Sequence, residues 1–452
     1  MTASVLPLAT AGSAAETAGT TQRVPGRYRK PRAVVVPASV ADHPGIYHLL
    51  TAVFQGPSRG EFRASLEDPH YQPHDRLLVK RGPQIIAHAL VTRRVMEFGP
   101  IELPVAGLDW LGTLPTLRGQ GHGRRLLVAA EEHMASTGAL AGLVWTRIPH
   151  FFRRTGWALC GRHFHSRGGA RDVISGLIAR GLLRRSHRRL NIRPWRRLEL
   201  GALVRIYKQN LDAAFGPFQR TEAYWKWLIH RGGYDQICVA LDGPDLLELE
   251  EVHAPIVGYS VTRGERIVEL LSAPGCPTAA AQLMARACRD AIERGRHTVS
   301  LDAPPNSRVD KLFRAASGKR HHHQMDPSLV LMVKLLSPVK LLRALAGELH
   351  RRAEEAQLAR PLELGLLVDG KKYRLAIHRD RVEAVGRNIG RSYLRLNVAD
   401  FTRLVLGHFD WDEALADGRV EPSTNLALEA GRVLFPPLPL WLPPLDNLPA
   451  RE

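Results

Sequence analysis

A glycine-rich turn between a strand pattern and a helix pattern is the feature that most constrains how this chain can fold. Residues 103–114, LPVAGLDWLGTL, predict a strand, and residues 124–138, RRLLVAAEEHMASTG, predict a helix that ends at its glycine. The turn between them contains RGQGHG at 118–123, with three glycines within five positions. Glycines let a backbone approach a ligand closely, and a helix start offers unpaired N–H groups with a partial positive charge. The pattern therefore predicts a site for an anion such as a pyrophosphate.

Two familiar nucleotide-binding loops do not fit this turn. A Walker loop ends in Gly-Lys-Ser or Gly-Lys-Thr, whereas this turn ends in Gly123-Arg124-Arg125. A dinucleotide fingerprint has the spacing G-x-G-x-x-G and an acidic residue at the end of the next strand. Here the glycines have a different spacing, and the next predicted strand ends in Thr146-Arg147. Both loop types are therefore disfavoured.

Strand and helix patterns alternate through the first part of the chain, which predicts an α/β or α+β unit built on a mixed sheet. In order, the patterns are a strand at 32–38, a helix at 44–54, a hairpin at 75–98, the strand and helix described above, a strand at 138–148 and a short helix at 149–157. A similar order restarts after residue 193, with a helix at 200–211, strands at 234–243 and 254–264, a strand, loop and helix within 265–295, and a strand at 297–304. Its loop lacks Arg-x-x-Gly-x-Gly, so we expect a second, degenerate copy of the first unit.

The composition changes again after residue 325, where a helix at 337–356, short strands and a helix at 400–407 predict a smaller α+β domain. The predicted limits are 1–32 for a disordered lead-in, 33–170 for the first unit, 171–192 for a basic linker, 193–330 for the second unit and 331–452 for the last domain. The arginines of this basic linker could alternatively bind phosphates. Such a run of arginines more commonly belongs to a linker or to a solvated helix face.

Composition narrows the class of protein further. Lysine and arginine outnumber aspartate and glutamate by 63 to 44, and this net charge of +19 favours anionic partners. The four cysteines form no C-x-x-C pair, which disfavours a zinc ribbon and a disulfide scaffold. The run from His321 to His323 is expected to be a polar loop, because adjacent side chains do not converge on one ion. No apolar run is long enough to span a membrane, and the first residues do not read as a secretory signal. We therefore expect no metal and a cytoplasmic protein.

The spacing Arg118-x-x-Gly121-x-Gly123 resembles the acetyl-CoA pyrophosphate loop of the GNAT acyltransferases. The segment FFRRTGW at 151–157 resembles the F-Y-x-x-x-G-F segment of the same family. The whole layout, with FTRLVLGHFDW and LFPPLPLWLPPLDNL near the end, resembles the enhanced-intracellular-survival (Eis) type of N-acetyltransferase. In that type, tandem GNAT units precede a domain similar to sterol carrier protein. The resemblance implies transfer of an acetyl group from the cosubstrate acetyl-CoA to a primary amine of a small molecule or peptide. It also implies a homo-oligomer, commonly a hexamer.

The resemblance further assigns roles to residues of the strand and the turn. Backbone N–H groups of Leu111 and Thr113 would hold the acyl-pantetheine arm, one of them facing the thioester oxygen. The residues implied around the pyrophosphate are Arg118, Gly119, Gly121, His122, Gly123 and Arg124. Such donors suit the chemistry, since attack of an amine on a thioester creates an oxyanion that preorganised N–H groups stabilise.

The acid and base depart from the family pattern. The tyrosine that protonates the departing thiolate falls at Phe152, which has no proton to give. The family uses its C-terminal carboxylate as base. Here the aspartate that resembles the family's terminal motif is Asp446, and the chain continues beyond it to Glu452. Candidate substitutes are His150 and Asp109. The alternatives for these two are a polar residue at the start of a short helix and a strand-edge carboxylate bonded to backbone.

Two further features and two rival functions remain open. Cys160 is either a nucleophile or, as we expect, a small buried residue. The aromatic residues Tyr224, Trp225 and Trp227 either line an acceptor pocket or, more commonly for such helices, fill a core. One rival function is a CoA-binding scaffold with little activity, suggested by Phe152. The other is a basic protein that binds nucleic acid or lipid, suggested by the net charge and the last domain.

Overall fold

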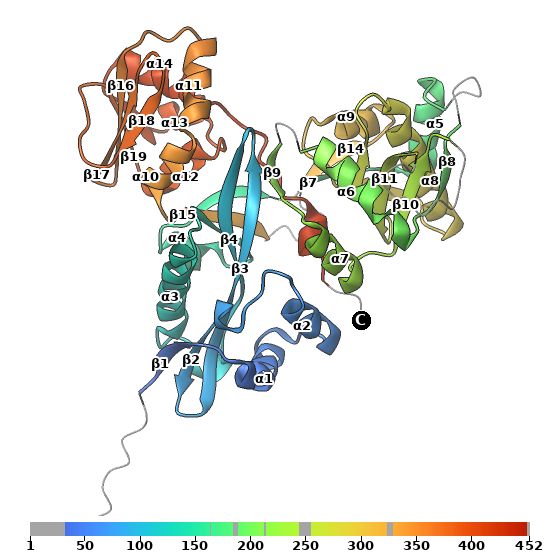
Figure 1. Ribbon diagram of the computed structural model, residues 1–452, viewed down its shortest axis with the longest axis horizontal. Helices are drawn as coiled ribbons and strands as arrows, with labels where there is room; N and C mark the ends of the chain where they lie inside the picture. The colour runs from blue at the N-terminus through green and yellow to red at the C-terminus, as the bar shows by residue number, and fades with distance from the viewer. Residues whose placement is uncertain are drawn as a thin grey trace, which may run out of the picture.

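The computed structural model describes residues 32–162, 164–183, 189–211, 214–243, 255–322 and 329–449. Three mixed sheets with flanking helices form three lobes (Figure 1). The predicted α/β fold class with mixed sheets is therefore confirmed. The arrangement of these sheets decides where distant parts of the chain meet.

The first sheet has the strand order β1-β2-β3-β4-β5-β15-β6, with β4 and β5 parallel and the other neighbours antiparallel. β9 (Phe215–Phe218) pairs with the outer part of β3. The strands are β1 (Val34–Pro37), β2 (Arg76–Arg81), β3 (Gln84–Phe98), β4 (Ile101–Thr113), β5 (Ala141–Thr146), β6 (Ala158–Arg162) and β15 (Val330–Leu335). The hairpin predicted at 75–98 and the strand predicted at 103–114 are confirmed as β2, β3 and β4.

The second sheet has the order β14-β7-β13-β12-β11-β10-β8, and its parallel pair is β12 and β13. Its strands are β7 (Phe164–Gly169), β8 (Asn191–Pro194), β10 (Gln236–Leu241), β11 (Ile256–Arg263), β12 (Arg266–Ser272), β13 (Thr298–Leu301) and β14 (Lys319–His322). Position by position, this order repeats the first sheet, and the parallel pair occupies the same place as β4 and β5.

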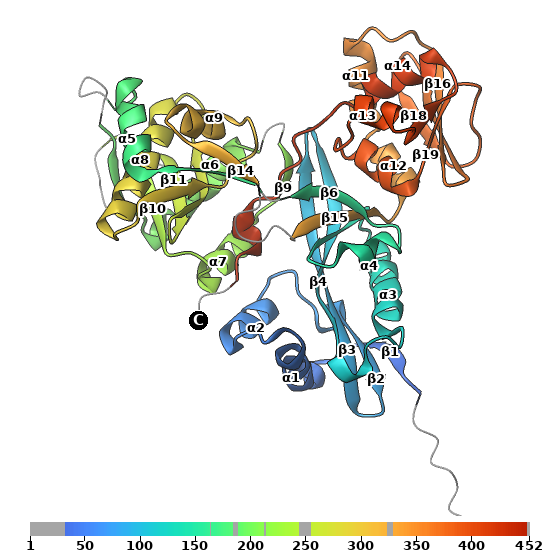
Figure 2. The same ribbon diagram turned by 180° about the vertical axis from the view of Figure 1, so that it is seen from behind.

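The two sheets exchange one strand each. β7 follows β6 along the chain but inserts between β13 and β14 of the second sheet. β15 follows β14 but inserts between β5 and β6 of the first sheet, and Figure 2 shows it beside β6. The predicted limits at residues 170 and 330 fall next to these two strands. The sequence pattern does not reveal their sheet membership, because each strand has the same alternation wherever it pairs.

Helices cover both faces of each of these sheets. α3 (His122–Ser136) packs on one face of the first sheet, while α1 (His43–Phe54) and α2 (Arg59–Leu66) pack on the other. In the second sheet, α8 (Pro277–Glu293) and α5 (Ala170–Ala179) cover one face, and α6 (Leu200–Gln209) and α7 (Glu222–Arg231) cover the other. The two remaining helices of these lobes are α4 (Pro149–Arg153) and α9 (Arg308–Ala315).

Helix α5 occupies much of the segment predicted as a basic linker, 171–192. Val173 and Leu177 lie one turn apart on α5 and are fully buried in the second core. This apolar stripe explains why the first part of the segment folds onto a sheet instead of forming a linker.

The third sheet has the order β18-β17-β16-β19-β20. Its elements are α10 (Pro338–Ala344), α11 (Ala346–Glu355), β16 (Leu362–Val368), β17 (Lys371–Ile377), β18 (Val382–Val385), β19 (Tyr393–Leu396), α12 (Val398–Val405), α13 (Trp411–Ala416), β20 (Val420–Pro422) and α14 (Asn425–Leu434). Its core is continuous with the far end of β3 and β4, since Phe98 and Leu103 belong to the same buried cluster as Leu342 and Phe401.

After the third lobe the chain returns between the first two. The backbone N–H of Trp441 donates to the carbonyl oxygen of Phe215 on β9, at 2.8 Å. A short 3₁₀ turn, Pro444–Asn447, then packs against the second lobe, where Leu445 and Leu448 are buried. The segment 442–449 thus lies at the junction of the two sheets (Figure 1).

Candidate functional site

Three adjacent strands of the first sheet form the floor of a cavity of about 550 Å³. Side chains on one face of a strand recur at every second residue. The floor residues are Leu90, Thr92 and Arg94 of β3, Gly107 and Asp109 of β4, and Leu143 and Trp145 of β5. The register sets Thr92 opposite Gly107, and Leu90 opposite Asp109. The intervening side chains, such as Val91 and Ala106, face the core beneath α3.

Asp109 is the carboxylate at the centre of this floor. Thr92 Oγ1 donates to Asp109 Oδ2 at 3.4 Å, across Gly107. A Cβ at Gly107 would lie 2.3 Å from Thr92 Oγ1, so this contact requires a glycine between the two side chains. The Asp109 side chain is exposed to the cavity, and protein surrounds that cavity. This desolvation raises the pKa of Asp109 above its ordinary value, against the opposing effect of Arg94. Such a carboxylate is suited to take a proton from a ligand.

A bulge interrupts β4 next to Asp109. The pairing shifts between His88 and Leu90, so that Trp110 and Leu111 both stand opposite one residue of β3. Trp110 has a φ of 58°, a left-handed conformation that non-glycine residues seldom adopt. Pairing with β5 ends at Gly107, while β4 continues six residues further to Thr113. The bulge therefore lies on a stretch of β4 that has parted from its parallel neighbour.

A buried histidine holds this bulge in place. His88 is fully buried, and burial together with the nearby Arg76 lowers its pKa to about 3. The ring is therefore neutral, with Nδ1–H donating to the carbonyl oxygen of Trp110 at 3.1 Å and Nε2 accepting from Arg76 Nη1 at 3.1 Å. Arg76 is itself enclosed, with its guanidinium 4.9 Å from the ring centre of Phe62. The unusual backbone at Trp110 is thus fixed by a buried network that contains a neutral histidine.

The turn before α3 leaves its backbone open. Gly119 and Gly121 have φ values of 78° and 79°, and a Cβ on either would meet no atom within 4 Å. Among the described residues, the backbone N–H groups of 119–124 donate to no other backbone group, and the first helical bond runs from Arg125 to Gly121. Arg118 Nε donates to the carbonyl oxygen of Thr113 at 3.2 Å, which ties the turn to the end of β4. These open N–H groups at a helix start can hold an anion.

His122, the first residue of α3, is a second sign of a ligand at this turn. The side chain is 6% exposed, and neither ring nitrogen has a hydrogen-bond partner in the part of the chain that the structure describes. Desolvation and the charges of Arg81 and Arg125 lower the pKa of His122. An unpaired buried ring is costly, and a phosphate oxygen at the turn would accept its N–H. The turn and His122 together fit a pyrophosphate.

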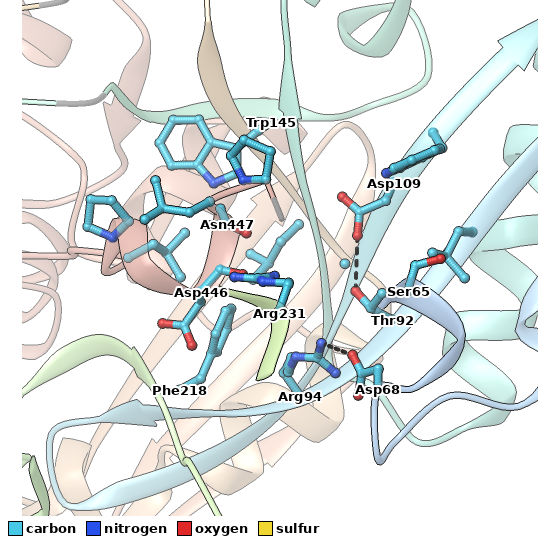
Figure 3. A pocket seen from close by; sticks show the side chains of 18 of the residues that line it. Ser65, Asp68, Thr92, Arg94, Asp109, Trp145, Phe218, Arg231, Asp446 and Asn447 are labelled. Atoms are coloured by element: carbon cyan, nitrogen blue, oxygen red, sulfur yellow. Dashed lines mark hydrogen bonds and ion pairs between the residues drawn. The ribbon is translucent and has the colours of Figure 1, made fainter. Parts of the chain in front are cut away.

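Segments far apart in the sequence close the cavity over its floor. Figure 3 shows Asp109 and Thr92 on one side and Asp446 and Asn447 on the other. Besides the floor residues and Trp110, the wall consists of Glu61, Ser65, Asp68, Arg147, Phe218, Tyr224, Trp227, Arg231, Arg266, Leu329, Leu442, Pro444, Asp446, Asn447, Leu448 and Pro449. The first lobe, the second lobe and the C-terminal segment all contribute, so the cavity exists only when the three are assembled.

Arginines neutralise two of the aspartates in the wall. Arg94 Nη2 donates to Asp68 Oδ2, and the guanidinium lies 4.8 Å from the ring centre of Tyr224. Arg220 donates to both carboxylate oxygens of Asp446, at 3.1 and 2.9 Å. Asp109, by contrast, forms no ion pair with any described residue. It is therefore the carboxylate that remains available to a ligand.

The Arg220 cluster fastens the C-terminal segment to the second lobe. Arg220 is almost fully buried and also donates to both carboxylate oxygens of Glu269 on β12, at 2.9 and 2.8 Å. Its guanidinium lies 4.2 Å from the ring centre of Tyr207. Arg231 adds a bond to the carbonyl oxygen of Leu445 at 2.8 Å. These bonds fix one wall of the cavity.

The predicted catalytic candidates end in different surroundings. Asp109 lines the cavity, whereas His150 is exposed on α4 and is not part of the cavity wall. Phe152 is 2% exposed, and its ring packs edge-on against Trp157 at 5.5 Å between centres. Cys160 is buried, and burial raises its pKa to about 12, which agrees with the expected inert thiol. The predicted residues of the strand and turn, from Leu111 to Arg124, lie together between the bulge and the start of α3.

The aromatic residues of α7 divide between the two roles considered. Tyr224 and Trp227 are buried and also line the cavity, whereas Trp225 belongs to the second core and does not line it. Of the histidine run, His321 and His322 lie on β14, and His323 falls outside the described residues.

Several residues of the site were not anticipated from the sequence. The alternation of β3 does place Thr92 and Arg94 on one face, and this signal was available in the sequence. Arg220 and Asp446 are separated by more than 200 residues, and no local pattern connects them.

No group of three or more His, Cys, Asp or Glu side chains among the described residues could hold a metal ion. No helix among them is long and apolar enough to cross a membrane.

Comparison with known proteins gives a family for the first lobe. Residues 35–160 match the family model described as an acetyltransferase (GNAT) domain. This range includes β4, the bulge, the glycine turn and α3. No curated protein matches the chain significantly.

Solved structures share the fold of nearly the whole chain. A GCN5-related N-acetyltransferase from Kribbella flavida is 16% identical with a TM-score of 0.69, over 91% of this chain and 98% of its own. A second from Anabaena variabilis is 16% identical with a TM-score of 0.70, over 91% and 99%. Eis1 from Mycobacterium abscessus is 15% identical with a TM-score of 0.61, over 90% and 98%. At these identities the likeness shows the fold alone. Residues 35–160 form an acetyltransferase domain of the GNAT type, and the expectation of an N-acetyltransferase is confirmed at the level of that domain.

Proposed function

We propose that the chain transfers an acetyl group from acetyl-CoA to a primary amine by direct attack of the amine on the thioester. The supporting observation is that the glycine turn and the cavity lie at the two ends of one short stretch of β4, which runs from the bulge at Trp110 and Leu111 to Thr113. This stretch has parted from β5, so its edge is free to pair with an extended arm of a ligand. A cosubstrate held at the turn would run along this edge and present its thioester beside Asp109.

The binding roles follow from the backbone. N–H groups of the turn would hold the pyrophosphate, with Gly119 and Gly121 leaving room for it and His122 adding a ring N–H. Arg118 and Arg124 would add positive charge at its edges. Leu111 and Thr113 would offer backbone N–H groups to the pantetheine arm and to the thioester oxygen.

The proposed reaction begins with the amine as an ammonium ion in the cavity. The ammonium gives one proton to the Asp109 carboxylate, and the neutral nitrogen attacks the carbonyl carbon of the thioester. The electron pair of the carbonyl bond moves to oxygen, where backbone N–H groups of β4 stabilise the charge. Collapse of this intermediate breaks the C–S bond, and the departing thiolate takes up the remaining excess proton of the nitrogen through water. The products are an N-acetyl amine, free CoA and a protonated Asp109, which then loses its proton to solvent.

The side chain of Phe152 has no acidic proton, so the proposed reaction assigns no side chain to protonate the thiolate. A CoA thiolate is a tolerable leaving group, and a single general acid is typically worth about 10²–10⁴-fold in rate. The enzyme is therefore expected to be active but slower than a relative that has a hydroxyl near the sulfur.

Finer features of the resemblance belong to the same proposal. The second lobe is a GNAT-like unit without a cofactor turn, which its repeated strand order supports. The third lobe is similar to sterol carrier protein, and the chain assembles into a homo-oligomer in the cytoplasm. Light scattering of the purified full chain measures the subunit number, and a monomer would contradict that part.

The main test is detection of free CoA with a panel of primary amines, on the wild type and on the double variant Arg118→Ala/Gly121→Trp. An indole side chain at Gly121 meets a strained φ and fills the turn, so the double variant is expected to lose both acetyl-CoA binding and turnover. Calorimetry measures binding directly. If the double variant binds acetyl-CoA as tightly as the wild type, the turn is not the cofactor site.

A second candidate function is a CoA-binding scaffold with little activity. It is favoured by Phe152, which is buried and has no acidic proton. It predicts tight binding of acetyl-CoA by the wild type and no release of CoA with any amine. The same assay therefore separates the two candidates.

A further inference from the structure

The cavity wall has a balanced formal charge, which bears on the kind of amine that it accepts. Among the residues that the structure describes, four arginines and four carboxylates line it. A site that selects a polycation presents an excess of negative charge, because electrostatic complementarity gives specificity. The balance here argues against an acceptor with several ammonium groups. This preference applies to the acceptor of the proposed acetyl transfer and rests on that function.

Seven of these eight charged groups already have partners within the chain. For example, Arg266 Nη2 donates to Asp302 Oδ2 at 2.6 Å, and Arg231 Nη2 donates to the carbonyl oxygen of Leu445 at 2.8 Å. Asp109 differs from them, since it has no charged partner among the described residues and accepts only a long hydrogen bond from Thr92, at 3.4 Å. Among the described residues, the cavity therefore offers one anchoring carboxylate, which lies on the middle strand of the floor and across the cavity from Asp446 and Asn447 (Figure 3).

The remaining wall is mostly apolar. Five leucines line it, together with the aromatic residues Trp110, Trp145, Phe218, Tyr224 and Trp227. A second ammonium group placed against these side chains would lose its hydration without gaining a free carboxylate. An uncharged hydrocarbon body would instead gain from burial, and aromatic rings favour edge-on or offset contact with others.

We infer that the acceptor is a monoamine, with one primary ammonium group and an uncharged aromatic or aliphatic body that fits about 550 Å³. Its ammonium group lies at Asp109, and its body extends across Trp145 and Phe218 toward the C-terminal segment. Polyamines are poor substrates, because the cavity offers no second free carboxylate among the described residues for an additional ammonium group.

Two matched pairs of amines test this inference on the full chain. The first pair is n-hexylamine and 1,6-diaminohexane, which have the same length and differ by one charge. We expect kcat/KM for hexylamine to be higher by about tenfold or more, because the distal ammonium of the diamine is desolvated. The second pair is phenethylamine and ethylamine, where burial of the phenyl group raises kcat/KM by about 10- to 100-fold. A diamine that is as good as hexylamine, or an ethylamine as good as phenethylamine, overturns the inference.

The variant Trp145→Ala connects the preference to the cavity. It removes an aromatic wall, so the ratio of kcat/KM between phenethylamine and ethylamine is expected to fall several-fold. The matched control is Trp195→Ala, which deletes an indole packed in the second lobe and outside the cavity wall, and which keeps the ratio of the wild type. A ratio that falls equally in both variants contradicts the assignment of the body site.

Calorimetry without acetyl-CoA separates failure of this inference from failure of the proposed function. If no amine releases CoA, acetyl transfer is wrong, but the order of amine binding still decides the inference. Tighter binding of hexylamine than of the diamine supports the monoamine site, and the reverse order overturns it. If the diamine and other polyamines are acetylated best, acetyl transfer stands and the monoamine inference falls.

Discussion

The first and second lobes use the same strand position for opposite purposes. β4 and β12 are each the fourth strand of their sheet and the first member of its parallel pair, and each carries a carboxylate on the face away from its long helix. Asp109 on β4 opens into a cavity with one weak hydrogen bond, whereas Glu269 on β12 is buried and held by Arg220 and Tyr259. The same architecture thus leaves one carboxylate free for chemistry and uses the other to hold the molecule together.

The turns that follow these strands differ in the same sense. Before α3, the backbone N–H groups of 119–124 remain open. Before α8, the N–H of Cys276 donates to Ala273 at 3.1 Å, the N–H of Ala279 donates to Cys276, and Pro277 has no N–H to offer. The second turn therefore satisfies two of its own donors and lacks a third at Pro277, which leaves fewer N–H groups for an anion.

The largest expected effect is on the free carboxylate. Asp109→Asn keeps the size of the side chain but removes the base, so kcat is expected to fall about 10²–10⁴-fold. Acetyl-CoA binding, measured by calorimetry, stays near the value of the wild type because the turn is untouched. The control Asp412→Asn changes an exposed aspartate of the third lobe and keeps full activity. Near-normal turnover by Asp109→Asn would mean that the base is elsewhere.

The sequence was informative about Asp109 and the turn because both depend on local patterns. Alternation along β4 and the glycine spacing before α3 predicted the strand, the turn and the helix within a few residues of their observed ends. It did not choose between Asp109 and His150, because that choice depends on which side chain faces the cavity. The exchanged strands β7 and β15 and the Arg220–Asp446 pair depend on contacts between segments more than 100 residues apart, for which one sequence contains no periodic signal.

The second expected effect is on the paired carboxylates. Arg220→Met leaves Glu269 and Asp446 buried without their cation, which is expected to lower the free energy of unfolding by about 3–5 kcal/mol. Urea unfolding measures this change. The matched control is Arg432→Met, whose partner Asp412 is exposed, and which is expected to cost about 0–1 kcal/mol. If the two variants lose equal stability, the Arg220 cluster is not what fastens the C-terminal segment.

A smaller effect tests the contact above Gly107. Gly107→Ala brings a Cβ to 2.3 Å from Thr92 Oγ1, so the strands must shift at an expected cost of about 1–3 kcal/mol. The variant is also expected to lower kcat, since Thr92 moves away from Asp109. Adding Thr92→Ala removes the clash and is expected to restore stability but not the rate. Gly347→Ala, with no atom within 4 Å of the new Cβ, serves as the control. Equal losses in the single and double variants would contradict this account.

The raised pKa of Asp109 gives a pH dependence with a definite sign. The base must be ionised, so kcat/KM is expected to fall as the pH drops through this raised value. In the same range the folded state binds the proton more tightly than the unfolded state, so ionisation of Asp109 makes the fold less stable as the pH rises. Asp109→Asn should therefore be more stable than the wild type at neutral pH, with a smaller difference below the unfolded pKa. Thermal unfolding across pH measures this, and a variant less stable than the wild type at neutral pH contradicts the desolvation of the Asp109 carboxylate.

The smallest expected effect on rate comes from Phe152→Tyr. The ring of Phe152 packs within the first core, 5.1 Å from the centre of Phe151 and 5.5 Å from that of Trp157. A hydroxyl added there meets apolar neighbours, so the variant is expected to lose some stability and to gain little in kcat. A large gain in kcat, with a new basic limb in the pH profile, would mean that the hydroxyl reaches the thiolate. In that case a proton donor for the thiolate would be the main catalytic group that the first lobe lacks. With no gain, the slow step of the proposed reaction depends on Asp109 and on the backbone donors of the bulge.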